Sequence, residues 1–309
     1  MTATTAPATG LSARALVPVV VLTLVWGSNW PILKLGVSDV APLTFRAFTL
    51  GLAALGMFAV AKLSGESIAV PRALWGRMVV LALLNISGWN GLLLFGLQQL
   101  PAGRSAILAY TMPLWSMLFS LVLLHEPLSP RRIVGLVLGM LGMALLLGED
   151  IGALQRTPTG AALILGSAMS WGLGVVMLRK WKPPLPPNAL TGWTMLIGWV
   201  PLVLAAPLFS PWPALSSLSG PAWFAIVYNI VLAGTLAHWA WFTLARTLPI
   251  AVSSMSSLPV PIFAVFAGIL VLGERPGIAE WVALGLVLAA MVAVLWPPKP
   301  APTPLAPDD

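Results

Sequence analysis

The sequence has no cysteine and very few charged residues. The absence of cysteine from all 309 positions excludes disulfide bonds, thiolate metal sites, iron–sulfur clusters and cysteine nucleophiles. Charged residues make up 8% of the chain, whereas they make up about 25% of an ordinary soluble domain. A soluble fold of this length needs a charged surface that this chain cannot form, and 59% of its residues are hydrophobic. The composition therefore indicates a multi-pass membrane protein.

Other absences narrow the function. No G-x-x-x-x-G-K-[ST] loop is present, which argues against ATP-driven pumping by this chain alone. The net charge of +7 comes from short basic clusters between apolar runs, so it does not predict nucleic-acid binding. The two histidines lie in different halves, and no metal cluster, paired carboxylates or Ser–His–Asp pattern falls within the membrane. We therefore expect no enzyme activity, no metal and no cofactor.

Ten apolar stretches approach the roughly 20 residues that a bilayer-spanning helix requires. Their length and continuity favour helices over a barrel. Residues 1–14 are predicted to form a disordered tail, and 297–309 a proline-rich, extended one. The predicted spans are 15–34, 42–62, 77–97, 104–124, 131–148, 159–179, 188–208, 222–244, 250–272 and 279–296.

Lysine and arginine are divided unevenly between alternate loops. With the N-terminus on the inside, the inner loops and tails hold eleven basic residues and the outer loops hold four. Basic residues concentrate on the cytoplasmic side of membrane proteins. Both termini are therefore predicted to be cytoplasmic, in a multi-pass protein of the inner (plasma) membrane.

The two halves of the chain share motifs at a nearly constant spacing. An ordered series of such matches is better evidence for duplication than any single pair. The matches are Leu100-Pro101 with Leu248-Pro249, Pro113 with Pro261 and Glu126 with Glu274, at an offset of 148, and Trp26-Gly27 with Trp171-Gly172, at an offset of 145.

We interpret the series as a duplication of five helices, with repeats at 15–149 and 159–296. An odd number of helices in each half forces the second half to insert upside down. The predicted fold is thus all-α, with ten transmembrane helices in two inverted five-helix repeats around a central cavity. This plan recurs in transporters, with the substrate site near the midplane between the halves.

Three segments resemble the drug/metabolite transporter superfamily, specifically proteins with two EamA domains. They are Trp26-Gly27-Ser28-Asn29-Trp30-Pro31 followed by Phe45-Arg46, the stretch from Ala106 through Pro113 to Leu128, and the stretch from Leu248 through Pro261 to Arg275. The resemblance covers about 15–296. It implies a cavity lined mainly by the first, third, fourth, sixth, eighth and ninth helices. Within this family the chain looks most like the YddG-like exporters of amino acids and related metabolites.

Polar side chains in mid-membrane are the default candidates for a substrate site. Here they are confined to the helices that the resemblance places around the cavity, including Asn229 of the eighth. Amides and an imidazole would hold amino and carboxylate groups, while indoles would pack on apolar groups or bind an ammonium. The predicted substrate-binding residues are Trp26, Asn29, Asn85, Trp89, Asn90, Tyr110, Trp171, His238, Trp241 and Ser257.

Helical spacing underlies part of this prediction. Asn85 and Trp89 are four residues apart and are predicted to share a face of the third helix. His238 and Trp241 are predicted to share a face of the eighth. The structural alternative stays open for each: an asparagine in a hydrogen bond between helices, or a tryptophan in packing or at the membrane interface.

Two prolines and three charged residues have predicted roles of their own. Pro113 and Pro261 each remove a backbone hydrogen bond, so we predict paired kinks that act as hinges at opposite ends of the cavity. Arg46, about one turn inside the second helix, is predicted to reach the outer surface or loop carbonyls, with a substrate carboxylate as the alternative. Glu126 and Glu274 are predicted to form caps or ion pairs.

No acidic residue falls in mid-membrane, where proton-coupled carriers often hold one. The predicted function is export of small neutral or zwitterionic metabolites, most of all amino acids with apolar or aromatic side chains, by alternating access down a gradient. A multidrug or other organic-solute exporter with proton exchange, through His238, is one alternative. A membrane receptor or scaffold is the other. The expected partners are a small-molecule substrate and the bilayer, and we expect a monomer.

Overall fold

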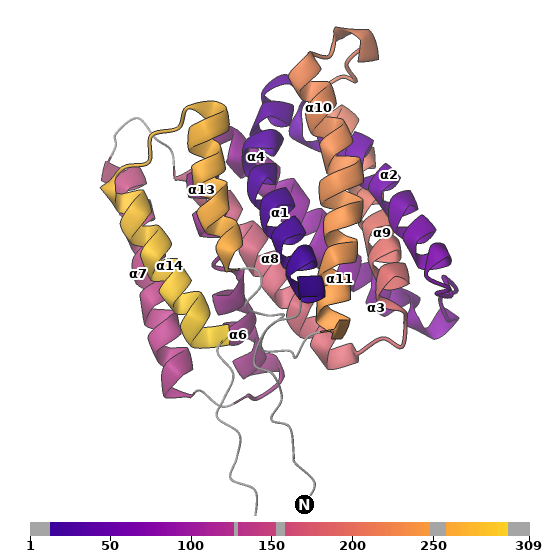
Figure 1. Ribbon diagram of the computed structural model, residues 1–309, viewed down its shortest axis with the longest axis horizontal. Coiled ribbons are helices and arrows are strands. Elements are labelled where there is room, and N and C mark those ends of the chain that lie inside the picture. Colours follow the sequence, from indigo (N-terminus) through magenta and orange to yellow (C-terminus); the bar gives the residue numbers. More distant parts are fainter. Residues whose placement is uncertain (1–12, 127–128, 153–157, 248–257, 296–309) are drawn as a thin grey trace, which may run out of the picture.

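The computed structural model describes residues 13–126, 129–152, 158–247 and 258–295. All regular elements in these ranges are helical, and they run side by side in one bundle (Figure 1). Helix α1 begins at Ala13 and ends at Asp39. We call the end of the bundle where α1 begins the near end, and the end where it finishes the far end. Helix α14, the last of the described helices, finishes at the near end (Figure 1).

The helices follow the predicted spans, with ends displaced by a few residues. Within the described ranges, nine helical stretches are long and apolar enough to cross a membrane. A shorter apolar helix, α13, has 14 residues, and residues 248–257 before it lie outside the described part of the chain. After α1 come α2 (Pro42–Leu63), α3 (Trp75–Ala82), η2 (Leu83–Gly88), α4 (Trp89–Gln99), α5 (Ala102–Ala109), α6 (Met112–Leu123), α7 (Pro130–Gly152), α8 (Thr159–Trp181), α9 (Pro187–Phe209), α10 (Gly220–Tyr228), η4 (Asn229–Leu236), α11 (Ala237–Thr247), α13 (Pro259–Leu272) and α14 (Ile278–Leu295), with 3₁₀ turns at Arg72–Leu74 and Leu215–Ser217.

Helix ends follow local chemistry. Helices α2 and α9 begin at Pro42 and Pro187, since proline has no N–H to leave unpaired in a first turn. Ser219 caps α10 by accepting a hydrogen bond from the N–H of Ala222 at 3.2 Å. Helix α13 ends at Leu272, and Gly273 follows with a φ of 66°, the left-handed conformation that glycine adopts without strain. These signals set the span lengths that hold the cavity residues at their depth.

Packing contacts repeat between the halves. A Cβ at Gly27 of α1 would lie 2.6 Å from Cδ1 of Phe263 in α13. A Cβ at Gly172 of α8 would lie 3.0 Å from Cβ of Trp115 in α6. Gly27 corresponds to Gly172 in the duplicated motif, and Trp115 precedes Phe263 by the offset of 148 residues. The close approach of these helix pairs is therefore built twice, as two inverted repeats require.

The third and eighth spans both contain a π-helical segment. Segment η2 begins at Leu83 and η4 at Asn229, so they occupy corresponding places in the two repeats. In the second segment, Thr235 Oγ1 donates to the carbonyl of Ile230 at 2.9 Å, five residues back. Such wide turns are rare and occur frequently at functional sites. Their pairing marks the middle of these two spans.

The fourth span bends, as predicted from Pro113. Helix α5 ends at Ala109 and α6 starts at Met112, with Pro113 in its first turn. The hydroxyl of Thr111, between the two helices, donates to the carbonyl of Leu108 at 2.6 Å. Pro261 lies likewise in the first turn of α13. The break before Pro113 is thus confirmed, whereas a hinge motion stays a prediction.

Candidate functional site

A cavity of about 140 Å³ lies among helices of both repeats. Its lining draws on α1, α2, η2, α4, α8, α9, η4, α11 and the bend between α5 and α6. Most of the predicted substrate-binding residues lie on its wall: Trp26, Asn29, Trp89, Asn90, Tyr110, Trp171 and His238. The remaining lining residues are Trp30, Leu33, Arg46, Leu50, Ile86, Leu93, Met112, Met195, Asn229, Ala233 and Gly234.

Aromatic rings form two walls of this cavity. The rings of Trp89 and Trp171 are 5.2 Å apart between centroids, with 56° between their planes. Trp26 stands edge-on to His238, with ring centroids 5.3 Å apart. The indole Nε1 of Trp26 donates to the carbonyl of Ala233 at 3.3 Å, which fixes the orientation of that ring. The walls therefore offer apolar ring faces already held in place.

Polar atoms interrupt these walls at a few positions. Asn90 donates from Nδ2 to the carbonyl of Ile86 at 2.8 Å. Nδ1 of His238 lies 3.0 Å from the carbonyl oxygen of Ala233, so that carbonyl favours a proton on Nδ1. The buried Oδ1 of Asn29 has no hydrogen-bond partner among the described residues. Its capacity to accept a hydrogen bond is therefore unused among the described residues.

Arg46 corrects the prediction that it reaches the membrane surface. It is only 6% exposed, lines the cavity, and donates from Nη1 to Oδ1 of Asn229 at 3.1 Å. In an isolated membrane helix, an arginine near the helix end extends its side chain to the nearest membrane–water interface. Here the buried start of α2 encloses the side chain, and Asn229 of η4 supplies an acceptor from the other repeat. The sequence signal was a mid-helix asparagine in the second repeat, which spacing alone does not pair with Arg46.

Two of the predicted residues that the structure describes, Asn85 and Trp241, are not in the cavity lining. Asn85 donates from Nδ2 to the carbonyl of Trp171 at 3.3 Å and packs against Gly174, so it joins two helices. The predicted shared face agrees with these contacts, because Asn85 and Trp89 both meet Trp171 of α8. Trp241 contacts the ring of Trp26, 6.2 Å away, rather than the cavity itself. Ser257 lies outside the described residues.

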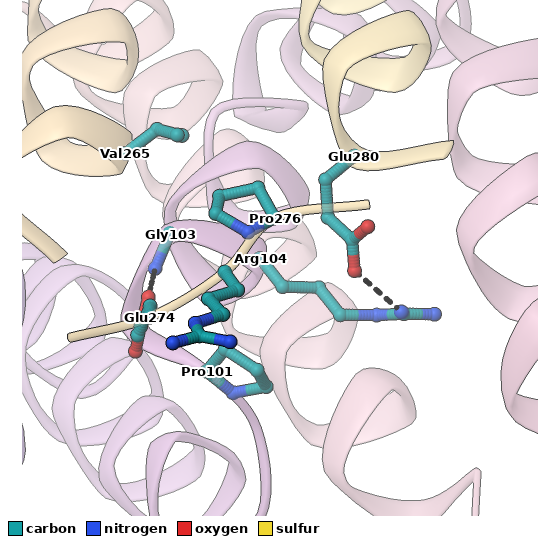
Figure 2. A pocket seen from close by; sticks show the side chains of 8 residues that line it. Pro101, Gly103, Arg104, Val265, Glu274, Pro276 and Glu280 are labelled. Carbon is teal, nitrogen blue, oxygen red and sulfur yellow. Dashed lines mark hydrogen bonds and ion pairs between the residues drawn. The ribbon is translucent and has the colours of Figure 1, made fainter. Parts of the chain in front are cut away.

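A second hollow, of about 230 Å³, lies at the far end (Figure 2). Oε1 and Oε2 of Glu274 accept hydrogen bonds from the backbone N–H groups of Ala102 and Gly103, at 2.5 and 3.0 Å. Arg104 pairs from Nη1 with Glu280 at 3.0 Å, and from Nη2 donates to the carbonyl of Leu146. We call Arg104, Glu274 and Glu280 the far-end cluster. Arg104 pairs with Glu280, and Glu274 is held by backbone N–H groups of α5, so these contacts join α5 to the segment around α13 and α14.

The predicted roles of the paired glutamates are confirmed. Glu274 caps the first turn of α5, where a carboxylate also complements the helix dipole. Glu126 forms ion pairs with Arg132 at 3.2 Å and Arg179 at 2.5 Å at the near end. None of the acidic side chains in the described ranges lines the central cavity. Those ranges also contain no group of three or more His, Asp or Glu side chains arranged to hold a metal ion.

Inverted repeats of apolar helices around a central, partly polar cavity define a membrane transporter of the ten-helix type. The model of the EamA-like transporter family matches the chain twice, at residues 14–148 and 158–296. The chain belongs to this family, and the double match agrees with the duplicated contacts described above.

Named relatives cover nearly the same length. The chain is 24% identical to the uncharacterized transporter YoaV of Bacillus subtilis, over 90% of this chain and 94% of YoaV. It is 29% identical to the uncharacterized inner membrane transporter YedA of Escherichia coli K12, over 93% and 94%. A solved crystal structure matches with a TM-score of 0.65 at 21% identity, over 91% of this chain and 96% of that one. These relatives support transport as the general activity, and the crystal structure supports the fold.

Proposed function

We propose that this transporter exports small neutral or zwitterionic metabolites, most of all amino acids with apolar or aromatic side chains. The observation that carries the proposal is the lining of the central cavity, which combines fixed indole rings with amides and lacks acidic side chains among the described residues. Indole faces suit an apolar or aromatic side chain, and amides suit the polar end of an amino acid.

The size of the cavity favours small solutes over drug-sized ones. Pockets for drug-sized ligands commonly measure about 300–1,000 Å³, whereas this cavity measures about 140 Å³. A space of that size holds roughly ten water molecules. A multidrug exporter would need a larger or more open chamber.

The proposed mechanism is alternating access between the repeats at 15–149 and 159–296, with Pro113 and Pro261 as hinges. The near end is cytoplasmic in this proposal, because the described loops there carry most of the basic side chains. Export runs down the substrate gradient. His238 favours one alternative, proton exchange, since its ring lines the cavity.

Counterflow of radiolabelled L-phenylalanine in reconstituted vesicles tests the proposal. Preloaded unlabelled L-phenylalanine should drive uptake of label by the wild type, and Trp89→Ala should reduce that uptake. The matched control is Trp281→Ala, because Trp281 lies outside the cavity and packs on Phe266. Binding without flux across a panel of amino acids would favour a receptor, and flux that requires a pH gradient would favour proton exchange.

A further inference from the structure

Two cationic side chains near the far end are compensated by hydrogen bonds or an ion pair within the protein. Lys34 donates from Nζ to the carbonyls of Leu97, Gln98 and Leu100, at 2.5, 3.1 and 2.7 Å. These oxygens close the carboxyl end of α4, which carries partial negative charge. Arg104 has the carboxylate of Glu280 and a backbone carbonyl. Buried charges in proteins are generally paired in this way, because an unpaired one is costly.

Arg46 departs from this pattern. Within the described residues, its hydrogen bonding consists of the single contact from Nη1 to the neutral amide of Asn229. Its buried Nε has no hydrogen-bond partner there. The guanidinium carries five N–H donors in a planar fork and stays charged. The guanidinium carbon lies 5.7 Å from the centroid of the Phe45 ring, which attracts the charge weakly. Most of the donor capacity is nevertheless unused, and no carboxylate among the described residues pairs with the charge.

Arg46, with its unused N–H donors, lies on the wall of the central cavity. Arg46 and Asn229 both line it, together with Asn29, whose buried Oδ1 is also without a partner among the described residues. A guest with an anionic group for the guanidinium and a donor group for Asn29 would satisfy both. An α-amino acid carries these two groups on one carbon.

The geometry points to Arg46 as the residue that binds the substrate carboxylate, with Asn229 orienting the guanidinium. The inference rests on the proposed export function and names the chemical group that the site requires. Arginine and a carboxylate form two parallel hydrogen bonds, which gives direction as well as affinity. The substrate class is therefore α-amino acids and related monocarboxylates.

The charge count within the cavity favours one carboxylate over two. Arg46 is the one lysine or arginine among the described lining residues. A dicarboxylate or a phosphate dianion would carry a second negative charge into an apolar enclosure with no cation to meet it. Phosphorylated metabolites are excluded from the inferred class for the same reason.

Four phenyl compounds separate the charged groups in a binding test. L-Phenylalanine has both groups, 3-phenylpropionate has only the carboxylate, phenethylamine has only the ammonium, and L-phenylalaninamide has the ammonium with a neutral amide. Each is added at equal concentration to the purified full-length protein, and the rise in Tm reports binding. L-Phenylalanine and 3-phenylpropionate should raise Tm, while the other two should leave it within error of the ligand-free value.

Variants assign the effect to Arg46. Arg46→Gln should abolish the difference between L-phenylalanine and its amide, and Arg46→Lys should restore part of it by returning the charge without the fork. Arg104→Gln is the matched control, because it alters a buried arginine that the protein itself neutralises. It should lower the ligand-free Tm and keep the preference for carboxylates.

The outcomes separate this inference from the export proposal. Equal Tm shifts for the acid and the amide in the wild type, a preserved preference in Arg46→Gln, or no shift with acetate, 3-phenylpropionate or any standard amino acid would overturn the inference. Arg46-dependent shifts without vesicle flux would support carboxylate binding and reject export. Equal flux of L-phenylalanine and its amide would support export and reject the role of Arg46.

Discussion

Arg104 and Arg46 are both buried arginines within apolar spans, yet their surroundings differ. Arg104 is 1% exposed and has a carboxylate, Glu280, together with the carbonyl of Leu146. Arg46 is 6% exposed and has the amide of Asn229. Desolvating a guanidinium is costly unless an anion and hydrogen bonds compensate. Arg104 therefore joins helices through its ion pair, whereas Arg46 is the arginine that we infer binds the substrate.

Glu280→Gln should have the largest effect on stability. Removing one partner of a buried ion pair costs about 3–5 kcal/mol, because the remaining charge loses its counterion. Arg104 would then resemble Arg46, but without a substrate to complete it. The expected result is a much lower Tm in detergent, with the preference for carboxylates unchanged. Replacing the pair together, as Arg104→Met with Glu280→Leu, should cost less than Glu280→Gln alone.

Arg46→Gln should weaken substrate binding without lowering the ligand-free Tm. A hydrogen bond to a charged group contributes about 1.5–3 kcal/mol, so binding of L-phenylalanine should weaken about ten- to a hundredfold. The ligand-free Tm should stay the same or rise, because the variant removes a buried charge that has no carboxylate partner among the described residues. Competition binding and thermal unfolding of one preparation measure both quantities. A fall in Tm as large as that of Glu280→Gln would show that the two arginines are alike.

Trp171→Ala sharpens the comparison at the other end of the substrate. Its ring lines the cavity, and an aromatic pair, here with the phenyl ring of the substrate, contributes about 0.5–1.5 kcal/mol beyond its buried area. L-Phenylalanine should bind about two- to tenfold more weakly, by conversion of that energy. Glycine, which lacks a side chain to pack there, should be unaffected in the same competition assay. Equal losses for both would mean that the variant distorts the carboxylate site instead.

Pro113→Leu and Pro261→Leu should change binding least of all. Neither proline belongs to the far-end cluster or contributes to the lining of the central cavity. If the bends govern opening and closing, flux should slow while the half-saturation concentration and protein yield stay near wild type. Initial rates of counterflow measure this. Unchanged rates in both single variants would remove the hinge proposal.

Much of the fold is predictable because the length of each apolar run and the duplicated motifs can be read directly from the sequence. The ten spans follow from apolar runs, and the duplication follows from motifs such as Trp26-Gly27 and Trp171-Gly172. Both tryptophans line the cavity. The family model, by matching twice, confirms the duplication independently.

The site is less predictable where two distant segments decide a residue's role. Arg46 and Asn229 are 183 residues apart, and neither helix alone reveals that they meet. Asn85 was expected to line the cavity, and it bonds instead to the backbone of α8, which was the structural alternative that helical spacing does not distinguish. Contacts between distant segments therefore account for the main errors.

The positive charge of Arg46, which has no carboxylate partner among the described residues, also affects which ions can enter the cavity. A carrier with a cavity that can hold several water molecules between its halves risks becoming a leak for protons and sodium ions. Fixed positive charge in a narrow passage excludes small cations, as it does in water channels. At about 5 Å and an effective dielectric constant of about 20, a second positive charge is opposed by about 3 kcal/mol. The same guanidinium that would attract a carboxylate would thus guard the ion gradients of the membrane that it spans.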